Sequence, residues 1–195
     1  MLRIFGLGMI CATLLFTSPT NAASSTGEYA IKDPGLVTCK QYSEEQSKTS
    51  KRYFQFVGWV TGYLSGHNRY AADNADIAPW QSNDLLAAFI GNYCRTNPDA
   101  RLVAATNQLI AALNPARLRS GSKRLKATVG EKAVSIYEAI LRRAQQMLAE
   151  RGHFTGIADG KFGPATRKAF EKFQKEKKLT VTGLPDQHTL LLIFQ

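Results

Sequence analysis

Residues 144–174 read AQQMLAERGHFTGIADGKFGPATRKAFEKFQ, and this stretch decides the fold of the C-terminal part of the chain. Apolar residues recur at helical spacing before Gly152 and again after Pro164. Proline suits the first turn of a helix, because the N–H that it lacks would have no partner there. The pair Asp159-Gly160 between the two periodic segments is typical of a turn. The stretch therefore predicts two helices joined by a turn-rich loop.

This stretch and a later G-L-x-D-x-x-T, residues 183–189, strongly resemble the three-helix peptidoglycan-binding module found on many wall hydrolases. The D-G-x-F-G-P-x-T-x-x-A core of that module is matched from Asp159 to Ala169. His188 departs from the pattern, since the family more often has a small residue there. The resemblance covers residues 136–195 and implies a third helix near the C-terminus and association with the cell wall.

Polar groups beside the loop are the candidate contacts to glycan and stem peptide. A ligand rich in hydroxyl, acetamido and carboxylate groups needs paired donors and acceptors, and its carboxylates favour nearby cations. The candidates are His153, Thr155, Asp159, Lys161, Arg167 and Gln174. For Asp159 we favour a second interpretation, in which it stabilises the loop and the start of the following helix.

Charge divides the chain into two parts. The net charge is +10, yet residues 23–114 carry eight basic and eight acidic side chains, against sixteen and seven in residues 115–195. Residues 115–130, PARLRSGSKRLKATVG, combine basic residues with Pro, Gly and Ser and predict a linker before a binding domain at 131–195. Two interpretations stay open for the linker, a solvated tether and a site for an anionic polymer or lipid surface. The cations concerned are Arg117, Arg119, Lys123, Arg124 and Lys126.

Residues 37–114 predict a second helical domain. Apolar residues follow a helical period in three stretches, residues 43–66, 82–94 and 100–113. Gly58, Gly62 and Gly66 lie on one stripe of the first of these helices. Since glycine costs a helix about 1 kcal/mol per residue, we expect a neighbouring helix of the same domain to pack closely against the stripe, with a dimer interface as the alternative. The predicted fold class is all-α, two small helical domains joined by a basic linker.

The N-terminus predicts export. Residues 1–22 have one basic residue, an apolar run too short to span a membrane and a small-residue end, as in a cleaved signal peptide. We expect a periplasmic or secreted protein without a transmembrane anchor, in which residues 23–36 form a flexible segment. Cys39 and Cys94 then remain as an even pair in an oxidising compartment. A disulfide is favoured over a cysteine nucleophile served by His67 or His153.

Three segments of the first domain resemble the small periplasmic HdeA-like helical domains. They are TCKQY (38–42), FVGWVTGYLSG (56–66) and NYCRTNP (92–98). Members of that family are disulfide-bridged, and the best known are acid-stress chaperones. The resemblance implies a helical fold for about residues 37–113 and a protein client or partner.

Catalytic motifs are not found in the mature sequence. The three histidines lack zinc-ligand spacing, and there is no G-x-S-x-G. Glu44 and Glu45 are adjacent on a predicted helix, so they point about 100° apart and make no facing acid–base pair. We expect a non-catalytic peptidoglycan-binding protein, without cofactor or metal, that localises a small helical domain at the wall. The alternatives are a wall hydrolase or a regulator of one, an acid-stress chaperone-like protein, and a polyanion-binding protein.

Overall fold

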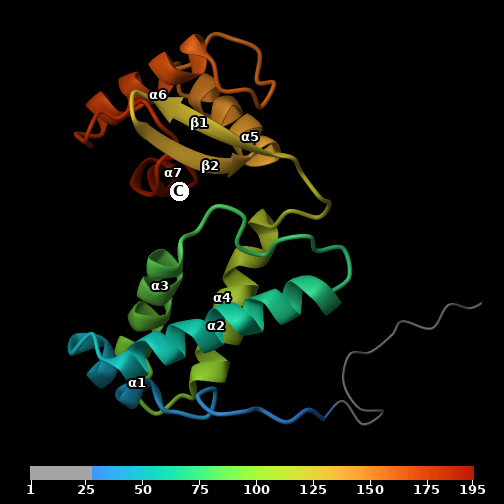
Figure 1. The fold of residues 1–195 in the computed structure, drawn as a ribbon, viewed down its shortest axis with the longest axis vertical. Helices are drawn as coiled ribbons and strands as arrows, with labels where there is room; N and C mark the ends of the chain where they lie inside the picture. The colour runs from blue at the N-terminus through green and yellow to red at the C-terminus, as the bar shows by residue number, and fades with distance from the viewer. Residues whose placement is uncertain (1–27) are drawn as a thin grey trace, which may run out of the picture. The chain divides into compact units, whose positions relative to one another are not determined.

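The structure, a computed structural model, describes residues 28–195 (Figure 1). The predicted signal peptide, residues 1–22, and the first part of the predicted flexible segment lie outside the described residues. The helices are α1 (Cys39–Ser47), α2 (Lys51–Tyr70), α3 (Asn83–Thr96), α4 (Leu102–Leu113), α5 (Glu138–Glu150), α6 (Pro164–Glu176) and α7 (Gln187–Ile193), and a short 3-10 helix spans Asn114–Ala116. The strands are β1 (Arg124–Val129) and β2 (Lys132–Tyr137). No helix in residues 28–195 is both long and apolar enough to cross a membrane.

Side-chain caps explain several of the helix starts. The Thr38 side chain accepts a hydrogen bond from the Gln41 N–H while the Gln41 side chain accepts from the Thr38 N–H, which is a capping box at the start of α1. At the start of α2 the Ser50 side chain accepts a hydrogen bond from the Tyr53 N–H, and at the start of α3 the Ser82 side chain accepts one from the Leu85 N–H. The helix expected over residues 43–66 is therefore two helices, because Ser50 starts a new one after α1 ends.

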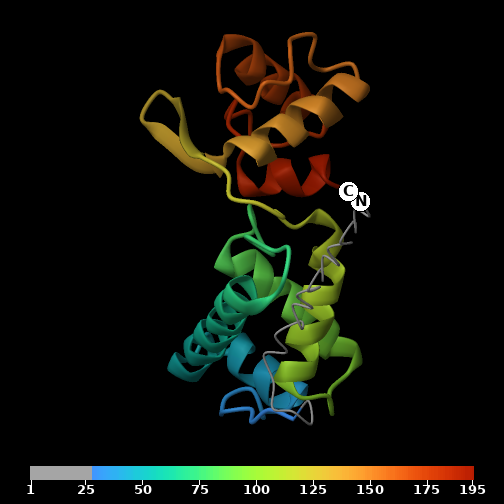
Figure 2. The ribbon, with the colours of Figure 1, turned by 90° about the vertical axis from the view of Figure 1, so that its right-hand side faces the viewer.

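Helices α1–α4 lie together in one part of the structure (Figures 1 and 2). Their buried side chains form one apolar core. Tyr42 and Phe56 are buried within it, and α1 packs against the other three helices. The predicted disulfide is confirmed, since Cys39 at the start of α1 is bonded to Cys94 near the end of α3. The bond leaves neither sulfur free to act as a nucleophile.

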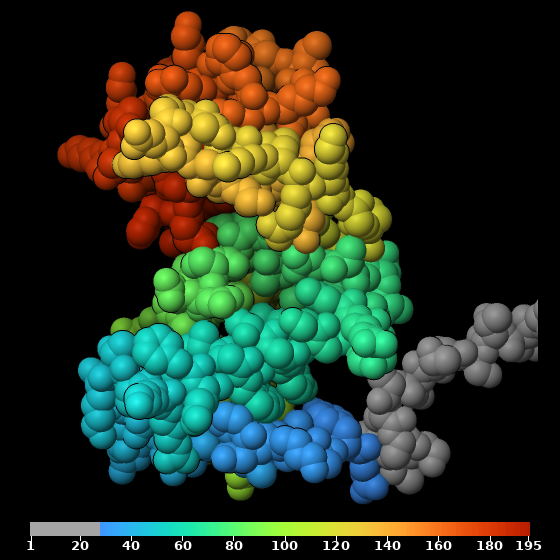
Figure 3. Space-filling view, in the orientation of Figure 1, coloured from blue at the N-terminus to red at the C-terminus, as the bar shows by residue number. Residues whose placement is uncertain are grey.

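The fold is mostly helical, but the all-α prediction is wrong in one place. Strands β1 and β2 form an antiparallel hairpin in which Arg124 pairs with Tyr137 and Val129 with Lys132. Six residues of the predicted linker thus form a strand, exposed on the face seen in Figure 3. In β1, cations occupy alternate positions and Ala127 on the opposite face is buried, so the basic composition concealed a period-two pattern.

Part of the predicted flexible segment is also ordered. The backbone N–H of Val103 donates to the Gly35 carbonyl, and the Arg101 guanidinium donates to the Leu36 carbonyl. Gly35 itself lies so close to the Trp59 ring that no Cβ would fit there. The chain before α1 is therefore fixed against α2 and the start of α4.

Among residues 28–195, no helix packs on the glycine stripe of α2. A Cβ added at Gly58, Gly62 or Gly66 would meet none of their atoms within 4 Å, apart from the nearby backbone of α2 itself. The expected close approach of a helix from the same domain is therefore wrong. The core side of α2 is formed by Phe56, Val60 and Leu64 instead.

Helices α5–α7 surround a second apolar core. Ile140, Leu141, Phe170 and Phe173 are fully buried in it, and Ile136 of β2 adds to it from the hairpin. Residues 31–195 form one compact unit containing both cores.

Candidate functional site

The loop between α5 and α6 is organised by one buried amide, Gln145. Its Oε1 accepts a hydrogen bond from the Gly160 N–H at 2.7 Å. Its Nε2 donates to the Lys161 carbonyl at 3.0 Å and to the Thr166 hydroxyl at 2.9 Å. Gln145 is only 1% exposed, so these bonds take the place of water for its carboxamide. The amide thereby joins α5, the loop and the first turn of α6.

The loop between α6 and α7 is built in the same way around Gln174. Its Oε1 accepts from the backbone N–H groups of Thr182 and Gly183, and its Nε2 donates to the Thr189 hydroxyl at 2.9 Å. In both loops the glycine has a positive φ, and a threonine follows it by six residues. The module therefore contains the same arrangement twice: a buried glutamine side chain hydrogen-bonds both a glycine in the turn and a threonine in the helix that follows.

Asp159 supports the first turn, as its favoured interpretation expects. Its carboxylate accepts the Lys161 N–H at 2.8 Å, and this backbone hydrogen bond is the main cause that lowers the pKa of Asp159. Gly160 next to it has φ +78°, and a Cβ there would lie 2.6 Å from the Glu138 carbonyl oxygen. Both conformation and space therefore require glycine at this position.

The six predicted ligand contacts do not share one surface environment. Thr155, Lys161 and Arg167 are exposed, and Asp159 is half-buried. Arg167 pairs with Glu171 at 2.7 Å. Gln174 is fully buried with both ends of its amide occupied, so it supports the second turn and presents no atom to a ligand.

His153 is also internal. Its side chain is 5% exposed, and its Nε2 lies 3.1 Å from the Glu176 carboxylate. The ring stands edge-on to Phe173, and its Nδ1 is buried without a hydrogen-bond partner among the described residues. The pKa of Glu176 is lowered, chiefly by a hydrogen bond from Lys177. His153 thus contributes to packing between the ends of α5 and α6.

A polar pocket adjoins the Asp159 turn at the start of α5. It has a volume of about 310 Å³, and it is lined by Leu118, Arg119, Ser120, Gly121, Ser122, Glu138, Ala139 and Arg142. Arg142 connects it to the turn, since its guanidinium donates to the Asp159 carbonyl at 3.2 Å. Two guanidinium groups and two hydroxyls suit carboxylate and acetamide groups of a ligand. The sequence motif gave no sign of this pocket, because five of its eight lining residues come from the predicted linker.

The cations of that linker have different surroundings. Arg117 has only 11% of its side chain exposed, and it pairs with the Asp73 carboxylate at 3.3 Å. Arg119 pairs with the same carboxylate while 62% of its side chain stays exposed. The remaining cations, Lys123, Arg124 and Lys126, are exposed. Arg117 is therefore used inside the protein, whereas the other four lie on its surface.

Within residues 28–195, no three or more His, Cys, Asp or Glu side chains are grouped so that they could hold a metal ion. Comparison with protein families matches residues 138–193 to the model described as a putative peptidoglycan binding domain. No match was found among curated proteins or among solved structures. The matched span contains α5, α6 and α7 with both glutamine-held turns, so the C-terminal part of the chain carries a peptidoglycan-binding module. For residues 37–114 the HdeA-like resemblance stays a prediction.

Proposed function

We propose that this protein is an exported, non-catalytic peptidoglycan-binding protein whose C-terminal module holds the helical domain, residues 37–114, at the cell wall. The family match over residues 138–193 is the observation that carries the proposal. A wall anchor needs no chemistry of its own. It acts by raising the local concentration of whatever it carries near partners in the wall.

The polar pocket at the start of α5 is the proposed contact surface on the module. Arg119 pairs with Asp73, and Arg142 pairs at 3.4 Å with Glu138, which also lines the pocket. The two arginines keep 62% and 48% of their side chains exposed, so both can still reach a ligand. Peptidoglycan stem peptides carry carboxylates, and bonds between a guanidinium and a carboxylate are among the stronger hydrogen bonds. Lys161 and Thr155 on the adjoining loop extend the surface that a glycan strand could cover.

The test is sedimentation of the purified full chain with insoluble peptidoglycan, at low and high salt. We expect binding that persists at high salt and no release of soluble wall fragments. A double variant, Arg119→Gln with Arg142→Gln, should bind about tenfold more weakly, since it loses two charge-assisted contacts. A charge-matched control, Lys168→Gln with Lys175→Gln, removes two exposed cations of α6 and should bind like the unmodified protein.

The outcomes separate the alternatives. Failure of the unmodified chain to sediment would overturn the wall-binding proposal. Equal loss in both double variants, together with binding that disappears at high salt, would favour general attraction to a polyanion. Release of soluble fragments would favour a wall hydrolase.

A further inference from the structure

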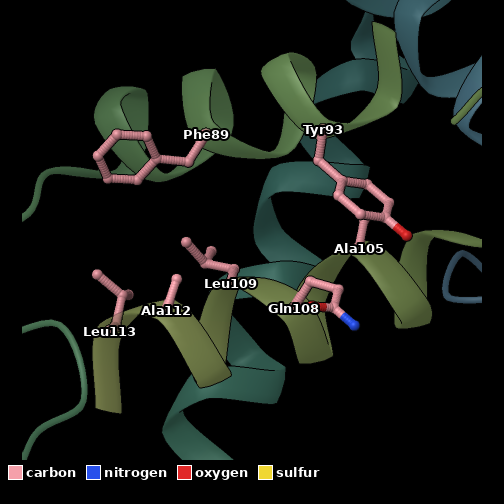
Figure 4. Close-up of a pocket in the computed structure, with 7 residues that line it drawn as sticks. All are labelled: Phe89, Tyr93, Ala105, Gln108, Leu109, Ala112 and Leu113. Atoms are coloured by element: carbon pink, nitrogen blue, oxygen red, sulfur yellow. The ribbon is translucent and has the colours of Figure 1, made fainter. Parts of the chain in front are cut away.

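An apolar groove lies between α3 and α4, and all seven residues that line it belong to these two helices. Its volume is about 490 Å³. The residues that line it are Phe89, Tyr93, Ala105, Gln108, Leu109, Ala112 and Leu113 (Figure 4). Pockets of this size, mostly apolar with a few polar groups, are typical of small-molecule sites.

The groove owes its width to the residues of α4. Ala105 and Ala112 leave space opposite the rings of Phe89 and Tyr93, while Leu109 and Leu113 form the floor and are 6% and 8% exposed. From Ala105 to Leu113 the helix rises by about 12 Å. The groove is therefore long enough for an extended chain of several carbon atoms.

The polar groups of the groove are gathered at one end. The Tyr93 ring and the Gln108 carboxamide lie together at that end, whereas Phe89 and Leu113 lie at the other (Figure 4). Neither the Tyr93 hydroxyl nor the Gln108 carboxamide is hydrogen-bonded to another residue among those that the structure describes. All seven lining residues are uncharged. The groove thus offers an apolar wall and one neutral hydrogen-bonding end.

We infer that this groove binds a small uncharged amphiphile with a single hydrocarbon chain, a site independent of the proposed wall binding. The chain would lie along Phe89, Leu109 and Leu113, and a hydroxyl or carbonyl head would hydrogen-bond Tyr93 and Gln108. A charged head gains no ion pair there, because all the residues that line the groove are uncharged. A peptide fits less well, since its backbone N–H and C=O groups would lie along the apolar wall without partners.

Decanol is the probe, titrated into the full chain with the disulfide intact and followed by calorimetry and by amide NMR shifts. We expect saturable binding, with the largest shifts in α3 and α4. Ala112→Trp places a large ring in the groove and should weaken decanol binding at least tenfold. The matched control is Ala111→Trp, which changes the adjacent exposed residue of the same helix, outside the lining, and should bind like the unmodified chain.

The head-group assignment has its own test. Tyr93→Phe removes one hydroxyl and should weaken decanol binding about fivefold, which corresponds to one hydrogen bond. Decanoate, with the same chain length and a charged head, should bind more weakly than decanol. The inference fails if decanol does not bind, if Ala112→Trp binds it as the unmodified chain does, or if decanoate binds more tightly. Circular dichroism of each variant verifies its fold.

Discussion

At the scale of single residues, the two buried glutamines are the most informative feature of the module. Gln145→Leu would leave the buried Gly160 N–H without an acceptor, and the Lys161 carbonyl would keep only the Thr166 hydroxyl as a donor. An unpaired buried polar group costs about 1–3 kcal/mol, so we expect the free energy of unfolding to fall by about 2 kcal/mol or more. Urea denaturation measures it. Gln146→Leu, at the exposed neighbour, should change it by less than about 0.5 kcal/mol. Equal values for the two variants would contradict the role given to Gln145.

Asp159 gives the module a stability that depends on acid pH. Because its pKa is lowered in the folded protein, the charged carboxylate stabilises the fold above the ordinary aspartate pKa of about 3.9. That contribution is lost as the pH falls through the lower folded value. Asp159→Asn should therefore be less stable than the unmodified chain near pH 6, and the difference should shrink toward pH 3. Denaturant unfolding at several pH values measures it, and a constant difference would contradict the assignment.

The residues of the first turn could be predicted from the sequence, but the role of Gln145, whose side chain hydrogen-bonds that turn, could not. Asp159, Gly160 and Pro164 are recognisable because their chemistry is local, a turn and a helix start. Gln145 and Gln174 are polar residues on the buried faces of α5 and α6, and a helical pattern alone does not say what they bond. A partner fifteen residues away, as Gly160 is from Gln145, becomes evident only in three dimensions.

At the scale of elements, the glycine stripe of α2 can be tested by adding methyl groups. Gly58→Ala, Gly62→Ala and Gly66→Ala place Cβ atoms where no other element of the described structure comes within 4 Å, so each should raise the free energy of unfolding by up to about 1 kcal/mol. Gly91→Ala is the control within α3, because its Cβ would lie 2.6 Å from the Gln46 side-chain oxygen. Thermal unfolding measures all four. Destabilisation by the first three would indicate that a partner molecule covers the stripe.

The sequence predicted elements best where apolar residues follow a helical period and a capping residue marks the start of the helix. Helix α3, Asn83–Thr96, agrees closely with the predicted stretch 82–94, and it starts where the hydroxyl of Ser82 accepts the Leu85 N–H. The hairpin was missed, since a two-stranded element has few apolar positions and three of its exposed positions, Arg124, Lys126 and Lys132, hold cations. The turn of the hairpin contains Gly130, with φ +58°. From the composition of residues 115–130, this glycine was predicted to lie in a linker.

At the scale of the whole molecule, the chain has two apolar cores, and we expect the disulfide to stabilise chiefly the core that contains it. Cys39 and Cys94 both belong to the first core, and their sequence separation is 55. On the chain-entropy account, closing a loop of that length stabilises the folded state by about 4 kcal/mol. A double variant, Cys39→Ser with Cys94→Ser, should therefore lose stability chiefly in α1–α4.

Hydrogen exchange measured by mass spectrometry distinguishes the two cores. We expect exchange in α1–α4 of the double variant to accelerate by orders of magnitude, because local opening there becomes easier by several kcal/mol. Exchange in α5 and α6 should stay within a few-fold of the unmodified chain, since their core contains neither cysteine. Equal acceleration in α6 would mean that both cores unfold as one cooperative unit. In that case a wall-bound module could not stay folded while the helical domain it carries opens.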